Sequence, residues 1–399
     1  MLPEGWHRTT LGAVAKFHSG NTPSKERTSF WGGDFPWVTA RDMKTLRLHA
    51  TKLGLSHAGV HEAAVAPSQA VLVLTRGMTL LKDLPVCLIE REMAFNQDIK
   101  ALVPLPEVYA PFLAYQLLAR KGAILNLVDT AGHGTGRLDT GLLKESEFWV
   151  PPLGEQRRIA SILSTWDQAI ATAERLVAAS QTEKDVLANV LLSGRRRLIH
   201  HQQWAPRPLS AMVYESRVLG SGGNTAKKLT VKLYGRGVVG KAEKRVGSES
   251  TQYYRRSAGQ FIYSKLDFLN GAFGLVPATL DGYESTLDLP AFDFLPGTEP
   301  RWFLHFVSRQ EFYLGHLGLA NGGRKARRVS PSDLLRVSID TPSFAEQRAI
   351  AEAIDLAQTR VICFEHQVRL LRDEKAALMA QLLTGKRRVR LDQEGTVSP

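Results

Sequence analysis

Two patterns in the sequence have residue types that could carry out chemistry. Gly235-Arg236-Gly237-Val238-Val239-Gly240, followed by Lys241, resembles the glycine-rich loops that bind nucleotide phosphates. Ala242, however, stands where a P-loop has its Mg²⁺-binding hydroxyl, and neither the acidic residue about 20 positions on nor the helix of a dinucleotide site is evident. We therefore expect a glycine-rich turn that brings backbone amides and Arg236 close to a phosphate.

The second pattern is Asp83 with Asp98-x-Lys100, which has the spacing of a metal-dependent nuclease and arises often by chance. The eleven histidines and two cysteines form no zinc or disulfide pattern, so we expect no structural metal. Neither a G-x-S-x-G nucleophile motif nor an N-P-P-Y-type methyltransferase segment is present. A single-chain DNA methyltransferase or nuclease with divergent motifs stays open as an alternative to a non-catalytic protein.

The positive charge is concentrated in one segment. The chain of 399 residues has a net charge of +12, and Arg195–Arg256 holds fourteen Lys and Arg against three Glu, a local charge of +11. Tyr234, Tyr253, Tyr254 and Phe261 are interleaved with these cations. Basic residues with aromatics predict a surface for phosphates and bases, whereas the alternative is a solvated basic face without a ligand.

The chain repeats itself at an offset of 191 residues. Glu155-Gln156-Arg157-Arg158-Ile159-Ala160 returns as Glu346-Gln347-Arg348-Ala349-Ile350-Ala351, and 15 of 43 positions from 155 to 197 are identical to those from 346 to 388. A looser echo joins Trp6-x4-Leu11 to Trp204-x4-Leu209. We therefore expect two similar halves, each a variable globular part followed by a shared segment.

The shared segment predicts a long helix in each half. Spacings alternate 4, 3, 4, 3 through Ile159, Leu163, Trp166, Ile170, Ala173, Val177, Ser180, Lys184, Leu187 and Leu191, and through Ile350, Ile354, Ala357, Val361, Phe364, Val368, Leu371, Lys375, Leu378 and Leu382. A 3.5-residue period held this long is typical of a coiled coil. Gly194 and Gly385 suit the caps that end such helices. Each helix would be about 58 Å long.

The repeat predicts the architecture. The fold class is mixed α/β, with two globular domains joined by two long helices that form an antiparallel coiled coil about a pseudo-two-fold axis. The predicted boundaries are 1–150 for the first head, 151–198 for the first helix, 199–341 for the second head, 342–390 for the second helix, and 391–399 for a tail. We expect the heads at opposite ends of the helix pair. A coiled-coil scaffold without a DNA function is a further alternative.

Short apolar runs in the heads predict strands. They are Trp37–Thr39, Ala70–Leu74, Val86–Ile89, Ile99–Val103, Leu229–Leu233, Gln260–Tyr263 and Phe273–Val276, and helices are expected over Tyr109–Leu125 and near Arg301–Phe312. No stretch approaches 18 apolar residues, and no signal-peptide pattern opens the chain. With two cysteines, these features predict a protein of the reducing cytoplasm without a membrane partner.

Several motifs together resemble the specificity subunit of a type I restriction–modification system. They are Leu2-Pro3-Glu4-Gly5-Trp6, Ser19-Gly20-Asn21-Thr22-Pro23-Ser24, Pro36-Trp37-Val38-Thr39-Ala40-Arg41-Asp42, Phe95-Asn96-Gln97-Asp98-Ile99-Lys100, Glu155-Gln156-Arg157 and Leu382-Leu383-Thr384-Gly385-Lys386-Arg387-Arg388. The second head lacks the first head's motifs, but Tyr234-Gly235-Arg236-Gly237-Val238 resembles a motif of other heads in the family.

This resemblance implies a DNA reader with no catalysis of its own. Each head would bind one half of a bipartite, asymmetric site in double-stranded DNA, and the helices would set the spacing and dock two modification (methyltransferase) subunits. No cofactor is expected in this chain. S-adenosylmethionine would belong to the modification subunits, and ATP and Mg²⁺ to the restriction subunits.

The candidate DNA contacts are polar or basic residues in these motifs and clusters. In the first head they are Asn21, Thr22, Ser24, Thr39, Arg41, Arg76, His133, Thr135 and Arg137; in the second they are Tyr234, Arg236, Lys241, Arg255, Arg256, Arg324, Lys325 and Arg327. Arginine can read guanine edges, and lysine more often holds phosphates. Each could instead be an ordinary surface charge.

Overall fold

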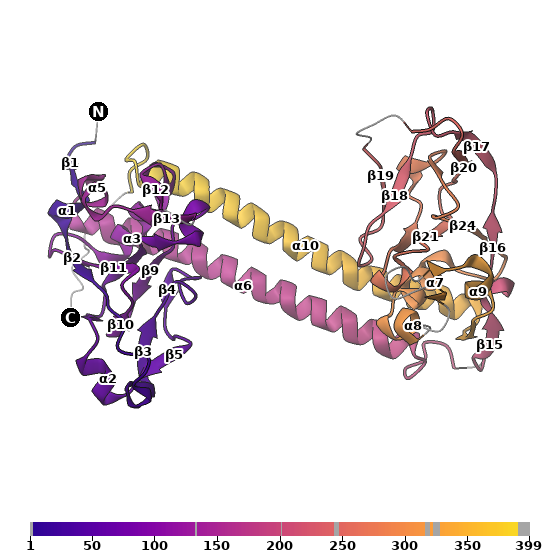
Figure 1. Cartoon of the computed structure of the whole chain (residues 1–399), viewed down its shortest axis with the longest axis horizontal. Helices are drawn as coiled ribbons and strands as arrows, with labels where there is room; N and C mark the ends of the chain where they lie inside the picture. Colours follow the sequence, from indigo (N-terminus) through magenta and orange to yellow (C-terminus); the bar gives the residue numbers. More distant parts are fainter. Residues whose placement is uncertain are drawn as a thin grey trace, which may run out of the picture. The chain divides into compact units, whose positions relative to one another are not determined.

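The computed structural model describes residues 3–131, 134–200, 202–242, 247–315, 320–321 and 328–389. Unit 1 combines Met1–Glu174 with His366–Pro399, and unit 2 is Arg175–Glu365. Each unit contains one head and parts of both long helices (Figure 1). The predicted mixed α/β class with two long helices is confirmed. No described helix combines the length and apolarity needed to cross a membrane.

The long helices are α6 (Leu153–Leu192) and α10 (Phe344–Leu382). All twenty side chains of the predicted stripe are buried or half-buried, whereas apolar residues off the stripe, such as Val186 and Leu356, are exposed. The 3.5-residue period thus gave the face that each helix packs inward.

Side-chain pairs between the two helices show that they are antiparallel in each unit. Unit 1 has Asp167–Lys375 at 2.5 Å and Glu174–Arg372 at 2.5 Å; unit 2 has Glu183–Arg360 at 3.0 Å and Lys184–Gln358 at 3.0 Å. In both units, partners with higher residue numbers on α6 have lower residue numbers on α10, as in an antiparallel pair. The repeat relates Lys184–Gln358 to Lys375–Asp167, so both lysines of the stripe have a partner across the helix pair.

The start of α6 is held by a cluster of three residues in unit 1. Glu155 is buried, and its carboxylate accepts hydrogen bonds from Trp6 Nε1 at 3.1 Å and from Arg388 Nη2 at 2.8 Å. The next residue, Gln156, donates to the carbonyls of Glu107 and Pro151 and accepts from the N–H of Tyr109. The Glu155 carboxylate therefore joins the start of α6 to two segments that are distant in the sequence, at Trp6 and at Arg388.

Unit 2 repeats this cluster at the start of α10. The carboxylate of Glu346 accepts from Trp204 Nε1 at 3.0 Å and from Arg197 Nη2 at 2.7 Å. Gln347 accepts from the N–H of Glu299 and donates to the carbonyl of Gly297. The Glu-Gln pair of each shared segment therefore fixes a helix start to its own head.

Glycines with left-handed backbones end both long helices. Gly194 has φ +71° and Gly385 has φ +73°, and the N–H two residues further on donates to the helix in each case, from Arg196 to the Val190 carbonyl and from Arg387 to the Gln381 carbonyl. This is the expected glycine cap, repeated at the offset of 191.

The first head has a sheet in the order β2-β11-β7-β9-β4 and a second in the order β5-β3-β10-β6. The strands are β2 (Ala15–Ser19), β11 (Ile99–Pro104), β7 (Val71–Leu74), β9 (Val86–Ile89), β4 (Arg47–Leu48), β5 (Leu53–Leu55), β3 (Trp31–Val38), β10 (Met93–Phe95) and β6 (Val65–Ala66). A sheet β12-β13-β8 follows, with β12 (Val128–Ala131), β13 (Thr135–Leu138) and β8 (Arg76–Gly77). The short helices are α1 (Leu11–Val14), α2 (His57–His61), α3 (Ala110–Ala119), α4 (Lys121–Leu125) and α5 (Thr140–Glu145).

The second head has sheets in the orders β16-β24-β21-β22 and β17-β20-β23, with hairpins β18-β19 and β25-β26. The strands are β16 (Val213–Ser216), β24 (Ala291–Phe294), β21 (Phe261–Tyr263), β22 (Phe273–Leu275), β17 (Leu219–Gly222), β20 (Gln252–Arg255), β23 (Glu284–Ser285), β18 (Leu229–Val231), β19 (Val238–Gly240), β25 (Ala320–Asn321) and β26 (Arg328–Val329). Its helices are α7 (Pro300–Val307), α8 (Gln310–Gly315) and α9 (Pro331–Leu335).

Each head is closed by its first and last strands. β1 (His7–Thr10) pairs antiparallel with β14 (Glu147–Val150), and β15 (Ala205–Pro208) pairs antiparallel with β27 (Ser338–Thr341). Residues from the long helices complete the apolar cores: Ile159 and Leu382 in the first, Leu191 and Ile350 in the second. The heads are therefore built onto the ends of the helices that flank them.

The two predicted head helices are each interrupted. The helix expected over Tyr109–Leu125 is α3 and α4, separated at Arg120, and the one near Arg301–Phe312 is α7 and α8. Arg120 turns away to stack on Trp149, 4.6 Å from the ring centre, and Arg309 stacks on Phe306 at 3.9 Å. Helical periodicity shows neither of these side-chain contacts, so the sequence predicted continuous helices.

Candidate nucleic-acid interface

A polar groove of about 310 Å³ lies on the first head. It is lined by Thr75, Arg76, Gln97, Asp98, Lys100, Arg137, Leu138, Asp139 and Thr140. Two of the predicted contacts, Arg76 and Arg137, therefore belong to one surface. Arg76 lies on β8 and Arg137 on β13, and the two residues are 61 positions apart in the sequence.

Arg76 and Arg137 face each other in the strand register. β13 pairs antiparallel with β8, and the register places Arg137 directly opposite Arg76. Both side chains are exposed, and no carboxylate of the described residues lies within ion-pair distance of either. Like charges directly opposite on paired strands destabilise a sheet. An anion between the two guanidinium groups would remove that penalty, so this pair suits a phosphate.

Thr22 reaches the same groove from the first motif loop. Its hydroxyl donates to Gln97 Oε1 at 2.5 Å, and Lys100 Nζ donates to Ser19 Oγ at 2.7 Å. Gln97 and Lys100 were not among the predicted contacts. The signal was present, because both stand in the Phe95–Lys100 motif, but sequence alone did not show which of its side chains are exposed.

Other first-head candidates have partners within the protein or lie elsewhere. Asn21 is tied to the backbone of Glu62 and Ala64, and Thr39 donates to Asp42 Oδ2 at 2.8 Å. Arg41 and Ser24 are exposed outside the groove lining, and Thr135 is half-buried on β13. His133 lies outside the described residues.

The nuclease-like spacing does not form one site among the described side chains. Asp83 forms an ion pair with Lys121, whereas Asp98 lines the groove and accepts from Asn96 Nδ2 at 3.3 Å. Within the described ranges, no three His, Cys, Asp or Glu side chains are grouped as a metal-ion site.

In the second head, the glycine-rich pattern forms the last part of the β18-β19 turn, at Gly235–Gly237, and then strand β19. β18 ends at Val231 and β19 begins at Val238, and the residue that follows Gly240 continues as a coil rather than a helix. Tyr234 and Arg236 are exposed in this turn, and Lys241 is exposed just after it. The expected turn is present, and the N–H groups of Tyr234 and Gly235 donate to the carbonyls of Asn270 and Gly271.

Arg256 is a correction to the predicted contacts. Its guanidinium is fully buried, and it donates to Ser285 Oγ at 2.7 Å and to the carbonyls of Ser216 and Leu289 at 2.9 and 3.3 Å. Burial lowers its pKa to about 10. The side chain supports the loop around β20 and cannot reach DNA from this position, whereas its neighbour Arg255 is exposed.

Three second-head candidates, Arg324, Lys325 and Arg327, lie outside the described residues, as do Lys244 and Arg245 of the basic segment.

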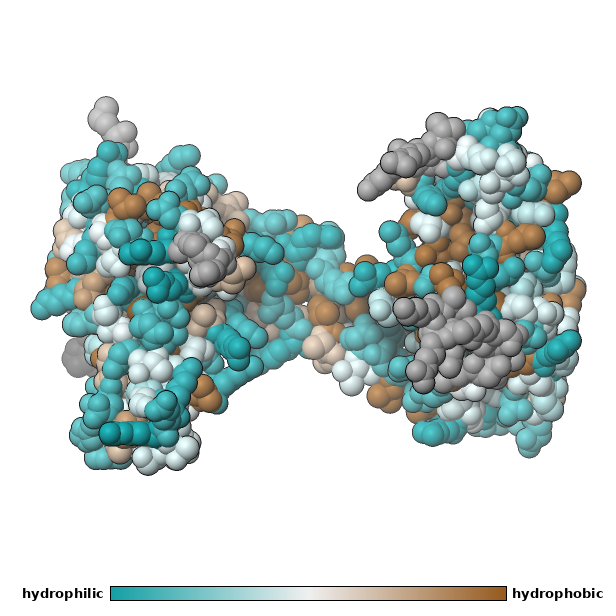
Figure 2. Space-filling view, in the orientation of Figure 1, coloured by the Kyte–Doolittle hydropathy of each residue, from teal (hydrophilic) through white to brown (hydrophobic). Residues whose placement is uncertain are grey.

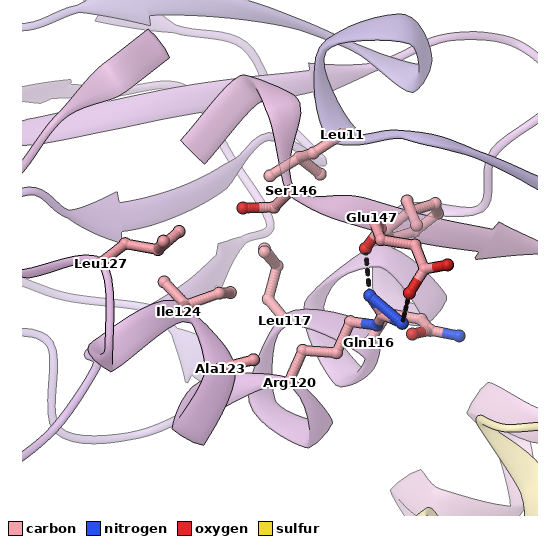
Figure 3. A pocket seen from close by; sticks show the side chains of 10 residues that line it. Leu11, Gln116, Leu117, Arg120, Ala123, Ile124, Leu127, Ser146 and Glu147 are labelled. Atoms are coloured by element: carbon pink, nitrogen blue, oxygen red, sulfur yellow. Dashed lines mark hydrogen bonds and ion pairs between the residues drawn. The ribbon is translucent and has the colours of Figure 1, made fainter. Parts of the chain in front are cut away.

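A second hollow in the first head has a different character. It measures about 250 Å³, and its walls include Leu117, Ile124 and Leu127, which Figure 3 shows directed toward the same space. Arg120 at its edge donates to Glu147 Oε2 at 2.8 Å and to the Glu147 carbonyl. Because its cation is neutralised, this hollow does not suit a phosphate.

Comparison with known proteins links the first half of the chain to DNA specificity domains. Residues 3–178 match the family described as the type I restriction modification DNA specificity domain. The specificity subunit of the Escherichia coli EcoR124I/EcoR124II type I restriction enzyme is 30% identical over 161 residues, 40% of each chain. The MjaIX specificity subunit of Methanocaldococcus jannaschii is 26% identical over 175 residues, 42% of this chain and 39% of that one. The chain thus spans about two fifths of the length of these relatives.

Solved structures share the fold along nearly the whole chain. An S subunit of a type I restriction-modification system from M. genitalium has a TM-score of 0.57 at 14% identity, covering 96% of this chain and 97% of the other. A chain from a study of assembly and conformational transition in the type I R-M system has a TM-score of 0.62 at 16% identity, covering 97% and 100%. The HsdS subunit from Thermoanaerobacter tengcongensis has a TM-score of 0.52 at 18% identity.

Proposed function

We propose that the chain is the non-catalytic DNA-reading subunit of a type I restriction–modification complex, because its residues 3–178 match the type I restriction modification DNA specificity domain. Each head binds one half of a bipartite, asymmetric site in double-stranded DNA. The second head lies beyond the matched domain, and its part in the proposal rests on the internal repeat and on the twin clusters at Glu155 and Glu346.

The proposal extends to partners and location. Two modification (methyltransferase) subunits dock on the long helices and bring S-adenosylmethionine, and restriction subunits bring ATP and Mg²⁺. The complex works in the cytoplasm. Methyl transfer to DNA by the isolated chain with S-adenosylmethionine would contradict the non-catalytic role.

The observation that carries the DNA-binding role is the unpaired arginine couple in the first-head groove, Arg76 opposite Arg137. In the test, the full chain selects its site from a pool of random DNA duplexes, and binding is then measured over a range of salt. Arg137→Ala should weaken binding and lower the slope of log affinity against log salt by about 1, because one phosphate contact is lost.

The matched control is Arg91→Ala, an exposed arginine between β9 and β10 that lies outside the groove. It should leave affinity and slope unchanged. Arg137→Ala should melt close to the natural chain, because it removes both the like-charged cross-strand pair with Arg76 and the opposite-charged one with Asp129. Equal effects of the two substitutions would remove the groove from the DNA-binding surface.

We further propose that the helix pair sets the gap between the half-sites. Thr172 and Cys363 are equivalent by the offset of 191, so seven residues inserted after each keep the heptad register. Such an insertion adds about 10 Å of helix, equal to about 3 base pairs. Methylome sequencing of a host with the complete system should report a gap longer by that amount, and an unchanged gap would refute the spacing role.

A further inference from the structure

The turn of the β18-β19 hairpin displays two adjacent apolar side chains. Tyr234 is 74% exposed, the highest value among the large apolar side chains of the described residues, and Leu233 beside it is 38% exposed. Figure 2 shows hydrophobic surface on the second head near the place where Figure 1 draws β21. Single exposed apolar residues are common, so exposure alone assigns no role.

The backbone at Tyr234 is the second observation. Its φ of +59° lies in the left-handed region, which a residue with a bulky side chain seldom adopts. The conformation is enforced, because the N–H of Tyr234 donates to the Asn270 carbonyl at 2.9 Å and that of Gly235 to the Gly271 carbonyl at 2.8 Å. Left-handed backbone persists where surroundings impose it, and such sites gather where ligands bind. The turn therefore holds the tyrosine ring outward before any ligand arrives.

Charge is the third observation. Lys232 and Arg236 flank the apolar pair and are exposed, and no described carboxylate forms an ion pair with either. An apolar tip between two cations has the composition of a protein element that enters between base pairs while its cations hold the phosphates on both sides.

From the enforced turn, the exposed ring and the flanking cations, we propose that Tyr234, supported by Leu233, is a wedge that unstacks one base step of the DNA bound by the second head. The ring stacks on the freed base face, and Lys232 and Arg236 bind the adjacent phosphates. This inference rests on the proposed DNA-binding function. It adds a deformation of the duplex, so that stacking strength at one step contributes to site choice without a base-edge hydrogen bond.

The test uses the purified full chain without modification subunits, so that no methyltransferase flips a base. After the chain has selected its site from random duplexes, 2-aminopurine is placed at each position of that site in turn. We expect one step to gain fluorescence several-fold on binding. Tyr234→Ala should abolish the gain and weaken binding about 10- to 100-fold, whereas Tyr234→Phe should retain both.

Three controls separate the wedge from other roles. Leu219→Ala removes a side chain of similar exposure, 72%, on the same head, and should change nothing. Arg236→Ala should lower the salt slope by about 1 while the fluorescence gain remains. Tyr234→Gly suits the left-handed backbone, so it should melt no lower than the natural chain and still lose the gain.

The results of these experiments distinguish a failure of DNA binding from a failure of the wedge. If no DNA sequence is selected, the proposed function itself fails. If the natural chain binds its site but no position gains fluorescence, or if Tyr234→Ala binds and unstacks as the natural chain does, the wedge is refuted while DNA binding stands.

Discussion

Arg388 and Glu155 stand 233 residues apart in the sequence, and the guanidinium of Arg388 donates to both carboxylate oxygens of Glu155, at 2.8 and 3.3 Å. The offset of 191 relates Glu155 to Glu346 and Arg388 to Arg197, and these two residues form the corresponding pair in unit 2. The segments are exchanged there, because the arginine follows α6 and the glutamate begins α10. Each unit thus contains the same buried glutamate paired with an arginine, and the two units take these residues from opposite parts of the chain.

The stability that the Glu346–Arg197 pair gives to unit 2 should depend on pH. Burial alone would raise the pKa of Glu346, but hydrogen bonds from Arg197, Trp204 and the backbone outweigh it, and the pKa lies below its ordinary value of 4.5. The unfolded chain therefore binds this proton more readily. The stabilisation is full above about pH 4.5 and is lost as the pH falls through the lowered pKa.

Urea unfolding at pH 7 and pH 4 measures this dependence. Glu346→Gln should be less stable than the natural chain at pH 7 by about 1–3 kcal/mol, and the difference should shrink at pH 4. The control Glu365→Gln changes an exposed glutamate of the same helix and should track the natural chain. A difference that does not change with pH would contradict the role of the carboxylate charge.

Ile354 and Leu356, two residues apart on α10, should respond oppositely to truncation. Ile354 is 3% exposed and packs in the second core, whereas Leu356 is 71% exposed. Ile354→Ala should cost about 2–5 kcal/mol of unfolding free energy, and Leu356→Ala should stay within about 0.5 kcal/mol. Similar losses in denaturant titrations would mean that the stripe is not the packed face.

The two cap glycines should differ in their tolerance of alanine. Both have left-handed backbones, so Gly194→Ala and Gly385→Ala should each cost about 1–2 kcal/mol. A Cβ at Gly385 would also lie 2.6 Å from Pro3, whereas one at Gly194 would lie 3.4 Å from the Trp204 ring. Gly385→Ala should therefore lower the melting temperature more; equal shifts would show that Pro3 moves aside freely.

Arg255 and Arg256 are adjacent but should fail in different assays. Arg256→Ala removes three hydrogen bonds, two of them buried, and should cost about 2–5 kcal/mol in thermal or urea unfolding. Arg255→Ala removes an exposed cation and should leave stability within about 0.5 kcal/mol while weakening DNA binding. A stable Arg256→Ala variant with weak DNA binding would restore Arg256 as a contact.

Local signals predicted the elements better than their pairing. The heptad stripe of α6 and α10 was readable because a 3.5-residue period is a property of one segment. Strands such as β9 (Val86–Ile89) were readable as apolar runs. The two-residue strand β8 was not, because it exists only through its pairing with β13, and that pairing is what brings Arg76 opposite Arg137.

The burial of individual polar residues was the other property that the sequence did not predict. Arg255 and Arg256 look alike in sequence, and only the fold decides that one faces water and the other Ser216 and Ser285. Gln97 was likewise hidden, because its exposure in the groove depends on strands from elsewhere in the first head. Residue type predicts charge, whereas accessibility follows from contacts made far along the chain.

The division of the chain into units has a consequence for biosynthesis. Unit 2 is one continuous stretch, Arg175–Glu365, whereas unit 1 needs the segment from His366 onward to complete it. Leu382 and Leu383 pack in the same core as Ile159 and Leu163, so that core stays open until translation has passed residue 383. The head that is translated first is therefore finished last, and a message truncated after residue 365 would leave it open.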